Sequence, residues 1–209
     1  MTEEYLTLLE DDEQRLKCLL DERSSTVVDR EVIEKKIWDL FGERWAIMFT
    51  DLVGFSRSVD SYGIIHFLNS IYSSRKIFRP IINNFNGWLI QEHADSLLVA
   101  FRNPSNALDC AIEMQKSTHN YNKKMEEKDK VIVCIGLGCG KVLRVGKSNL
   151  YGQQVNAASR LGEDIAKGQE ILITQSFKES LDEISDENLE ELGSSHPSLV
   201  NSYKLHYQV

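Results

Sequence analysis

Two aspartates, Asp51 and Asp95, stand where carboxylates could bind metal ions. Asp51 ends the short apolar run from Trp45 to Phe49, and a turn at Gly54 follows it. The loop after such a strand can offer a backbone carbonyl beside the carboxylate. Hard ions such as Mg²⁺ take oxygen ligands, usually one or two carboxylates together with water and phosphate oxygens. An isolated aspartate at a strand end is more often a helix cap or a turn residue, so Asp51 alone does not establish a metal site.

Asp95 strengthens the metal hypothesis because of its place in a predicted hairpin. Residues 88–91 and 97–101 are expected to form its two strands, with His93, Ala94 and Asp95 at the tip. If the hairpin pairs beside the first strand, the two carboxylates converge at neighbouring strand ends. Such a pair can hold two ions, one activating a hydroxyl nucleophile and the other bound to a triphosphate. His93 is expected at the surface, without a catalytic role.

The elements that must position these aspartates follow from the spacing of apolar residues. In order, we expect a strand ending at residue 51, a helix over 64–85 that Pro80 kinks or restarts, the hairpin, and a helix opening at Pro104. A strand over 131–137, a glycine-rich turn and a segment 141–145 that extends or pairs with that strand should follow. The last expected elements are a helix over 154–166, a strand over 170–174, a short helix over 176–181 and an edge strand over 202–209. This β-α-β-β-α-β order predicts an α+β fold. Its simplest form is the ferredoxin-like arrangement, one antiparallel sheet with helices packed on one face.

The first 42 residues form a segment of their own. One helix is expected up to Glu22, and Asp29 can cap a second. The two helices either pack on the domain or act as a dimerising or signal-receiving element that meets a regulatory partner, and two short helices do not establish a coiled coil. The sequence therefore divides into an N-terminal helical segment, 1–42, and a domain, 43–209.

Composition excludes several classes of protein. The net charge of -8 argues against non-specific binding of nucleic acid. No apolar run approaches the ~20 residues that span a bilayer, and the acidic N-terminus is unlike a signal peptide. The four cysteines (Cys18, Cys110, Cys134 and Cys139) form no C-x-x-C and lie in apolar stretches, which favours buried, reduced thiols. A cytoplasmic protein is expected.

Four segments resemble, in order, the motifs of class III adenylyl and guanylyl cyclase catalytic domains. Phe49–Ser56 is similar to their first metal motif, F-x-D-x-x-G-F-[ST], and Gln91–Asp95 to their hairpin motif. Gly140–Val142 resembles their G-[RK]-V segment, and Tyr151–Leu161 their G-x-x-V-N-x-A-[AS]-R helix. The first and fourth motifs are specific on their own. The resemblance extends from residue 44 to about residue 175.

The resemblance implies a site shared by two chains. Asp51 and Asp95 of one protomer would bind two Mg²⁺ or Mn²⁺ ions, assisted by the carbonyl of Leu52. Asn156 of the other protomer would orient the ribose, and Arg160 would stabilise charge on the reacting α-phosphate, a role suited to guanidinium. Without the family, Asn156 and Arg160 would be read as a solvated helix face.

The implied reaction is attack of the ribose 3′-hydroxyl on the α-phosphate of a nucleoside triphosphate. It gives a 3′,5′-cyclic nucleotide and pyrophosphate, and it needs alignment and charge neutralisation more than a protein nucleophile. Lys141 would lie near the β- and γ-phosphates. One catalytic domain per chain implies a homodimer with two symmetric sites.

The sequence departs from the family pattern where the base would be read. Gln91 and Asn149 replace the usual charged pair, and because amides both donate and accept, they could pair with either purine. Ala94 replaces the usual glycine of the hairpin, and residues 194–198 lack the lysine that often precedes the last strand.

The leading interpretation is a metal-dependent nucleotide cyclase that uses ATP, which is the commoner substrate of bacterial-type enzymes, rather than GTP. The alternative is a catalytically weak or inactive module that binds nucleotide or signals by dimerising. A diguanylate cyclase is disfavoured because the chain lacks a GG(D/E)EF signature.

Overall fold

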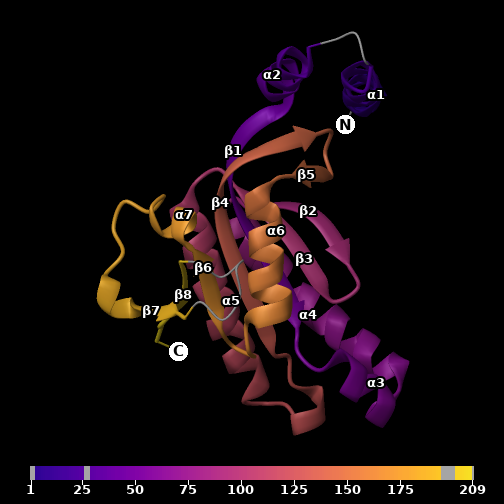
Figure 1. The fold of residues 1–209 in the computed structure, drawn as a ribbon. Coiled ribbons are helices and arrows are strands. Elements are labelled where there is room, and N and C mark those ends of the chain that lie inside the picture. Colours follow the sequence, from indigo (N-terminus) through magenta and orange to yellow (C-terminus); the bar gives the residue numbers. More distant parts are fainter. Residues whose placement is uncertain (1–2, 26–28, 194–200, 209) are drawn as a thin grey trace.

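The computed structural model describes residues 3–25, 29–193 and 201–208. Figure 1 labels the elements, which are α1 Glu3–Arg23, α2 Arg30–Phe41, β1 Gly42–Leu52, α3 Phe55–Tyr62, α4 Ile64–Asn84, β2 Trp88–His93, β3 Ser96–Phe101, α5 Pro104–Asn122, β4 Val133–Val145, β5 Asn149–Tyr151, α6 Gln153–Arg160, β6 Ile171–Thr174, α7 Gln175–Lys178, β7 Leu189–Leu192 and β8 Ser202–Leu205. Short 3₁₀ turns at Glu127–Asp129 and Asp186–Asn188 and a π-turn at Leu161–Ile165 complete them.

The sheet confirms the ferredoxin-like α+β fold. Its strand order is β2-β3-β1-β4-β6-β8-β7, and β5 pairs with the far end of β4. The four core strands are antiparallel to their neighbours, whereas β6 runs parallel to β4. The strand over 202–205 was expected at an edge, but it pairs on one side with β6 and on the other with β7. Strand β7 was not predicted because two of its four residues, LEEL, are exposed glutamates, so the segment contains no apolar run.

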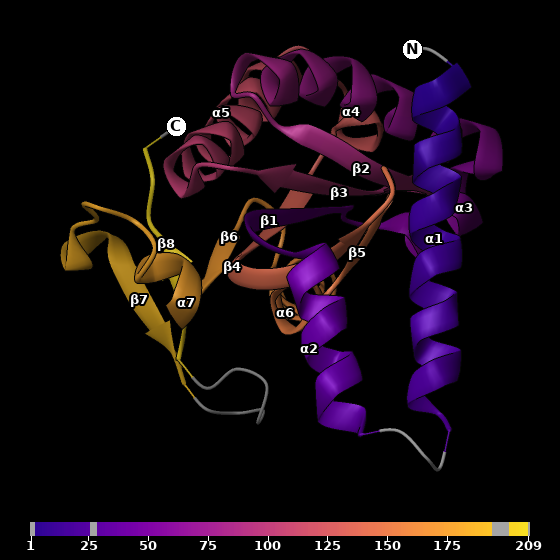
Figure 2. The ribbon, with the colours of Figure 1, turned by 90° about the horizontal axis from the view of Figure 1, so that it is seen from above.

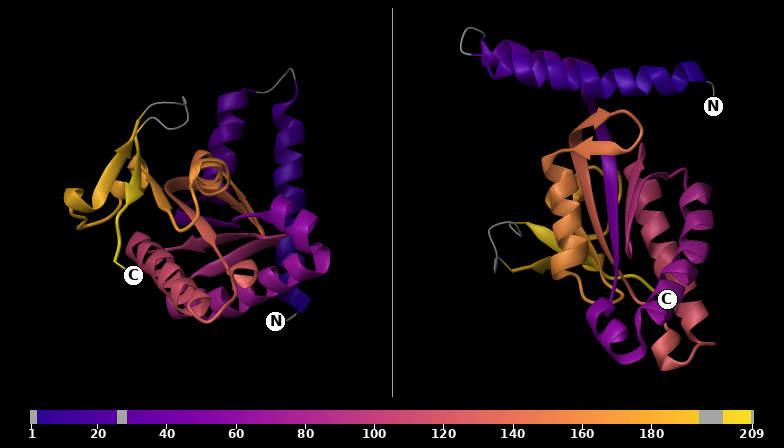
Figure 3. Two further views of the ribbon diagram at one scale, coloured as in Figure 1. Left: turned by 90° about the horizontal axis from the view of Figure 1, so that it is seen from below. Right: turned by 90° about the vertical axis from the view of Figure 1, so that its right-hand side faces the viewer.

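Helices cover both faces of the sheet, not one face as expected (Figure 3). On one face α4 and α5 bury the main core, in which alternate β1 residues Ala46 and Met48 meet α5 residues such as Met114. On the other face α6 covers a smaller cluster that includes Trp45 and Ile47. The two faces of β1 therefore serve two cores, which explains why its sequence is apolar throughout instead of alternating.

Glycines in β4 let α6 lie directly on the sheet. A Cβ built on Gly136 would lie 2.1 Å from the Ala158 carbonyl oxygen, and one on Gly138 would lie 2.7 Å from that of Gln154. The predicted glycine-rich turn is therefore wrong: these glycines alternate along one continuous strand, Val133–Val145. In this strand glycine marks a close approach of another backbone, not a reversal of the chain.

Helix α4 runs through Pro80 without restarting, so that part of the expectation is wrong. Both Pro80 and Lys76, whose carbonyl loses its helical partner, are exposed, and water can satisfy the freed oxygen. The predicted cap at Asp29 is confirmed, since its side chain accepts a hydrogen bond from the Glu31 N–H. The helix predicted to open at Pro104 does so, and Asn103 caps it by accepting a hydrogen bond from the Ser105 N–H.

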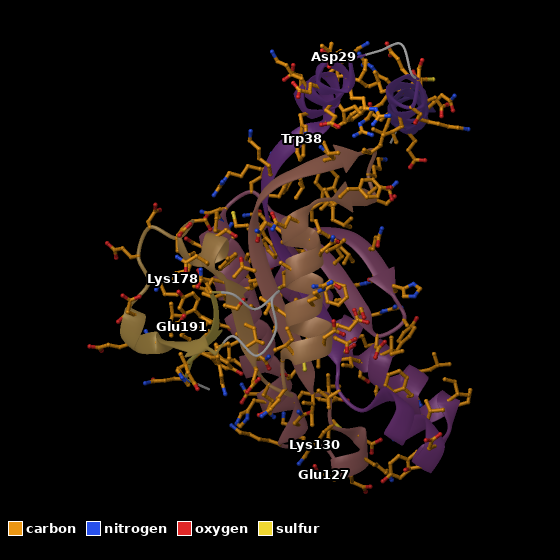
Figure 4. All side chains as sticks on the ribbon, viewed as in Figure 1. Asp29, Trp38, Glu127, Lys130, Lys178 and Glu191 are labelled. Atoms are coloured by element: carbon orange, nitrogen blue, oxygen red, sulfur yellow. The ribbon has the colours of Figure 1, made fainter. Side chains whose placement is uncertain are left out.

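Helices α1 and α2 form a hairpin that packs on the β4–β5 end of the domain (Figures 1 and 2). Its contact is a separate apolar cluster, made by Leu16, Leu19, Ile33, Ile37, Phe41, Leu143 and Val145. Figure 4 shows Asp29 and Trp38 on this hairpin, at the opposite end of the molecule from Glu127 and Lys130. Cys18 is exposed on α1, which corrects the expectation that all four cysteines are buried, and the other three are buried free thiols. No helix among the described residues has the length and apolarity needed to cross a membrane.

Candidate functional site

Asp51 lies near the end of β1, on the sheet face that α6 covers, because it continues the alternation of Trp45 and Ile47. The Ser96 hydroxyl, at the start of β3, donates a hydrogen bond to Asp51 Oδ1 at 2.9 Å. The backbone N–H of Leu52 also hydrogen-bonds to this carboxylate. On the other side Asp51 is in register with Cys134 of β4. The pairing of β1 with β3 thus brings the two predicted metal segments together.

The electrostatics of Asp51 are unfavourable for an ionised carboxylate. Partial burial raises its pKa from 3.8 to about 6, against the opposing effect of the Ser96 hydrogen bond, and the nearby carboxylates Asp95 and Glu163 raise it further. Burial also raises the pKa of the neighbouring Cys134 thiol to about 12, so this thiol stays neutral. Among the described residues no cation pairs with Asp51. A half-buried carboxylate with acidic neighbours and no counter-charge fits a divalent cation.

The number of candidate carboxylate ligands is compatible with an ion whose coordination phosphate oxygens and water complete. The part of the chain that the structure describes contains no group of three or more His, Cys, Asp or Glu side chains that could hold a metal ion. Two carboxylates are what Mg²⁺ usually takes from a protein when phosphate oxygens and water supply the remaining ligands. Two aspartates are within the number of carboxylates that Mg²⁺ takes from a protein.

Asp95 occupies the turn of the β2–β3 hairpin, next to Ser96. The hairpin tip is fixed to α4, since Arg75 Nη2 donates to the Ala94 carbonyl at 2.9 Å and Arg79 makes a two-pronged pair with Glu92 at 2.9 and 2.7 Å. Within the described residues the Asp95 side chain makes no hydrogen bond or ion pair, so its oxygens are available to a ligand. His93 is exposed at the hairpin tip, as expected.

Asn156 and Arg160 lie on the exposed face of α6. The opposite face of the helix, with Val155 and Ala158, packs on the sheet. Both Asn156 and Arg160 are exposed, and neither side chain has a hydrogen-bond or ion-pair partner in the described part of the chain. They are one helical turn apart, so they can act on one ligand, but no contact joins them to the aspartates of their own chain.

The structure does not bring Lys141 to the aspartates of its own chain. Lys141 pairs in register with Arg44 of β1, whereas Asp51 pairs with Cys134. Seven residues of β1 separate the two levels, which corresponds to about 23 Å at ~3.3 Å per residue. Residues 194–198, which lack the lysine expected before the last strand, lie outside the described residues.

Gln91 and Asn149 do lie together, at the point where β5 approaches β2. Gln91 Nε2 donates to the Ser148 carbonyl at 2.8 Å, and Asn149 Nδ2 donates to Glu13 Oε1 at 2.7 Å. No local pattern indicates Glu13, which is 136 residues away from Asn149.

Two further residues near Asp51 were not predicted. Ser96 directly follows Asp95, and the strand register needed to aim it at Asp51 could not be known in advance. Glu163 follows Arg160 in the π-turn, and its influence on Asp51 depends on how closely that turn packs on β1. There Gly162 is so close to β1 that an added Cβ would lie 2.8 Å from the Phe49 carbonyl oxygen.

An exposed apolar surface lies beside these segments. It consists of Tyr62, Ile64, Ile65, Leu68 and Tyr72, called here the α4 apolar face. Ile65 is 69% exposed and Tyr72 67% exposed. Helix α3 and the start of α4 follow the Asp51 loop, and Arg75, later in α4, holds the hairpin that carries Asp95, so the helices that carry this face connect the two aspartate segments.

Comparisons with known proteins identify a matching family and several relatives. A family model described as the adenylate and guanylate cyclase catalytic domain matches residues 41–199. A putative adenylate cyclase 3 of Rhizobium meliloti is 26% identical over 116 residues, which is 56% of this chain and 20% of that protein. A serine/threonine-protein kinase, pkn2, of Myxococcus xanthus is 27% identical over 129 residues, 62% of this chain and 15% of that protein. The chain thus spans only a small part of these relatives.

Solved structures share the fold. The crystal structure of an adenylate/guanylate cyclase/hydrolase from Silicibacter pomeroyi superposes with a TM-score of 0.66 at 22% identity, over 80% of this chain and 99% of that one.

Proposed function

Because this chain belongs to the family of adenylate and guanylate cyclase catalytic domains, we propose that it converts ATP, in preference to GTP, to the 3′,5′-cyclic nucleotide and pyrophosphate. The reaction would require two Mg²⁺ or Mn²⁺ ions and a homodimer. The observation that carries the proposal is the state of Asp51. Its carboxylate is half buried beside Asp95 and Glu163, its pKa is raised to about 6, and no described cation offsets it.

Asp51 and Asp95 would hold the two ions, with the carbonyl of Leu52 as a further ligand. Bound there, the ions would offset negative charge at the reacting hydroxyl and at the triphosphate. Ser96 would keep the Asp51 carboxylate in one orientation through its hydrogen bond. Glu163 adds negative charge close to Asp51, which increases the attraction of this end of the site for cations.

The second half of the site would come from the partner protomer. Asn156 would hold the ribose so that its 3′-oxygen faces the α-phosphate, and Arg160 would stabilise charge on that phosphate. Both side chains are exposed and have no described protein partner. The 3′-hydroxyl loses its proton to solvent, its oxygen forms a bond to the α-phosphorus, and the bond from this phosphorus to the bridging oxygen breaks, so that pyrophosphate leaves with the electron pair.

The α4 apolar face supports the homodimer. It exposes several large apolar side chains on the helices that connect the two aspartate segments, and contact with a second copy would remove them from water. Gln91 and Asn149 would read the base. Lys141 of β4 pairs with Arg44, which is seven residues before Asp51 in β1. We therefore assign Lys141 no contact with a triphosphate held by the aspartates of its own chain.

Production of cyclic nucleotide tests the proposal directly. The purified chain is incubated with ATP or GTP and with Mn²⁺ or Mg²⁺, and cAMP and cGMP are measured. We expect cAMP as the main product, and at least a hundredfold loss in Asp51→Ala. Absence of product under all four conditions, or an equal rate in Asp51→Ala, contradicts a metal-dependent cyclase.

Mixing two inactive variants tests the shared site. Asp51→Ala and Arg160→Ala each damage a different half, so a heterodimer of the two keeps one intact site. Random exchange in an equal mixture is expected to restore about a quarter of the wild-type rate. Failure to recover activity, although exchange of subunits is demonstrated, contradicts a site built from two chains.

A second candidate is a module that binds nucleotide or dimerises but turns over slowly. The observation in its favour is that Gln91 and Asn149 are both engaged by protein groups in this structure. Nucleotide binding without product, in the experiment above, would support it.

A further inference from the structure

We propose that Glu13, on helix α1, is a positioning residue for base selection: it fixes the Asn149 amide so that the site favours adenine over guanine. This inference rests on the proposed function, because it requires Asn149 to face a purine. It assigns to the N-terminal segment a part in substrate choice that the catalytic domain alone does not provide.

The hydrogen bond between Glu13 and Asn149 sets the orientation of the Asn149 amide. Asn149 Nδ2 donates to Glu13 Oε1 at 2.7 Å. A carboxylate only accepts hydrogen bonds, so it faces the amino end of the amide and not the carbonyl end. The Oδ1 atom of Asn149 is therefore turned away from Glu13 and is left as the acceptor that Asn149 offers to a ligand. Among the described residues no other side chain hydrogen-bonds to the Asn149 amide.

The hydrogen bond of Gln91 does not restrict this residue to an acceptor or to a donor. Its Nε2 donates to the Ser148 carbonyl at 2.8 Å, which holds the turn before β5 against β2. One N–H and Oε1 of Gln91 remain, so it can donate to N1 of adenine or accept from N1–H of guanine. Discrimination between the two bases then depends on the atom that Asn149 presents.

An acceptor at Asn149 matches adenine. Adenine carries an amino group at C6, which donates, whereas guanine carries a carbonyl oxygen at C6, which only accepts. Asn149 Oδ1 facing this position would pair with ATP and would oppose the O6 atom of GTP. A mismatch of this kind leaves polar groups unpaired, which is how hydrogen-bonding sites reject a wrong substrate.

Packing against β4 holds helix α1, and therefore Glu13, in a defined position. Leu16 and Leu19 lie one to two turns beyond Glu13 and pack with Leu143 and Val145 of β4. Figure 2 shows α1 running alongside β5 and the β2 edge of the sheet. Because β5 pairs with the same end of β4, the packing that docks α1 also sets the position of Glu13 relative to Asn149.

Nucleotide affinity gives a test that does not depend on turnover. ATP and GTP are titrated into the full chain with Mg²⁺, and the ratio of the two dissociation constants is compared between variants. We expect Glu13→Ala to lower the preference for ATP about three- to tenfold, the effect of one net hydrogen bond. Glu13→Gln should keep the preference, because its amide oxygen still accepts from Asn149. Glu22→Ala is the control, since Glu22 is an exposed acid of α1 whose side chain has no described partner.

A double variant sharpens the test. Asn149→Asp offers only acceptors, but it places a second carboxylate against Glu13, so the single variant should bind both nucleotides more weakly. Glu13→Ala combined with Asn149→Asp removes the repulsion and should restore the preference for ATP. An unchanged affinity ratio in Glu13→Ala, or an equal change in Glu22→Ala, overturns the role of Glu13 and leaves the cyclase proposal standing. Binding without cyclic product contradicts the activity alone, and absence of binding by either nucleotide overturns both.

Discussion

The Asp51 carboxylate makes the stability of the metal-free protein depend on pH. Its pKa is raised in the folded state to about 6, so the folded chain binds this proton more tightly than the unfolded chain does. The stabilisation is fully present below the ordinary pKa of an aspartate and is lost as the pH rises through about 6. We therefore expect Asp51→Asn to raise the melting temperature at pH 8 in the presence of EDTA, and to raise it much less at pH 4.5. Thermal unfolding followed by circular dichroism measures both.

Metal ions provide the matching control for this prediction. At pH 8, millimolar Mn²⁺ should raise the melting temperature of the wild-type chain, because an ion that binds only the folded state stabilises it. Asp51→Asn should lose most of this gain, and Asp39→Asn, an exposed acid on α2, should keep it. A stabilisation by Asp51→Asn that is the same at both pH values would show that charge is not its cause.

Ala94 carries backbone strain at the hairpin tip. Its φ is 47°, in the left-handed region that glycine adopts freely and alanine does not. This explains in physical terms why a glycine is usual at this position of the family motif. We expect Ala94→Gly to stabilise the chain by about 0.5–1 kcal/mol, after the entropy that glycine adds to the unfolded state is included. Urea unfolding measures it, and a loss of stability contradicts the strained conformation.

Helices and strands could be predicted from the sequence where neighbouring residues specify them, and not where a contact distant in the sequence does. Strand β1, the cap at Asp29 and the helix start at Pro104 were recognisable because short-range patterns specify them. The glycines at 138 and 140 were misread as a turn, since their cause is the approach of Gln154 of α6, a contact that no local pattern reveals. Strand β5 was missed because three residues with no alternation give no signal until β4 is there to pair with them.

The glycine stripe of β4 is open to a direct test. In Gly136→Ala the new Cβ would lie 2.1 Å from the Ala158 carbonyl oxygen and 2.5 Å from the Gly162 nitrogen, both backbone atoms that side-chain rotation cannot move. Helix α6 must shift away from the sheet, and overpacking of this kind costs about 1–3 kcal/mol or more. We expect a loss of stability in that range and a larger loss of activity, because Asn156 and Arg160 move with the helix. Gly193→Ala is the control, since its Cβ meets nothing within 4 Å.

At the level of the whole molecule, the candidate site divides into a part that the sequence could predict and a part that it could not. Asp51 and Asp95 were predictable because strand ends and hairpin tips follow from local patterns. The engagement of Asn149 by Glu13 was not, because it arises only when the N-terminal hairpin docks on β4 and β5. The position of Lys141 near the phosphates stays a prediction: within one chain it lies seven residues of strand away from the level of Asp51, and a motif match carries no information about the level of a residue along a long strand.

The α4 apolar face leads to a prediction about assembly. Ile65 is the most exposed member of this face, at 69%, and it lies at the start of α4, which follows the Asp51 loop and the short helix α3. A charge buried at the centre of an interface without a partner is strongly unfavourable, whereas the same charge on the free surface of a monomer is hydrated and tolerated. We therefore expect Ile65→Glu to yield a folded monomer without cyclase activity. Sedimentation velocity gives the mass, and circular dichroism confirms the fold.

Val32→Glu is the matched control for Ile65→Glu, because Val32 is an apolar side chain of α2 that is 59% exposed and lies outside the α4 apolar face. It introduces the same charge on a helix surface, so it should leave mass and activity unchanged. If Ile65→Glu stays dimeric and fully active, the α4 apolar face does not form the dimer. If it becomes monomeric and retains its activity, one chain suffices for the reaction, and Asn156 and Arg160 must then reach the aspartates of their own protomer.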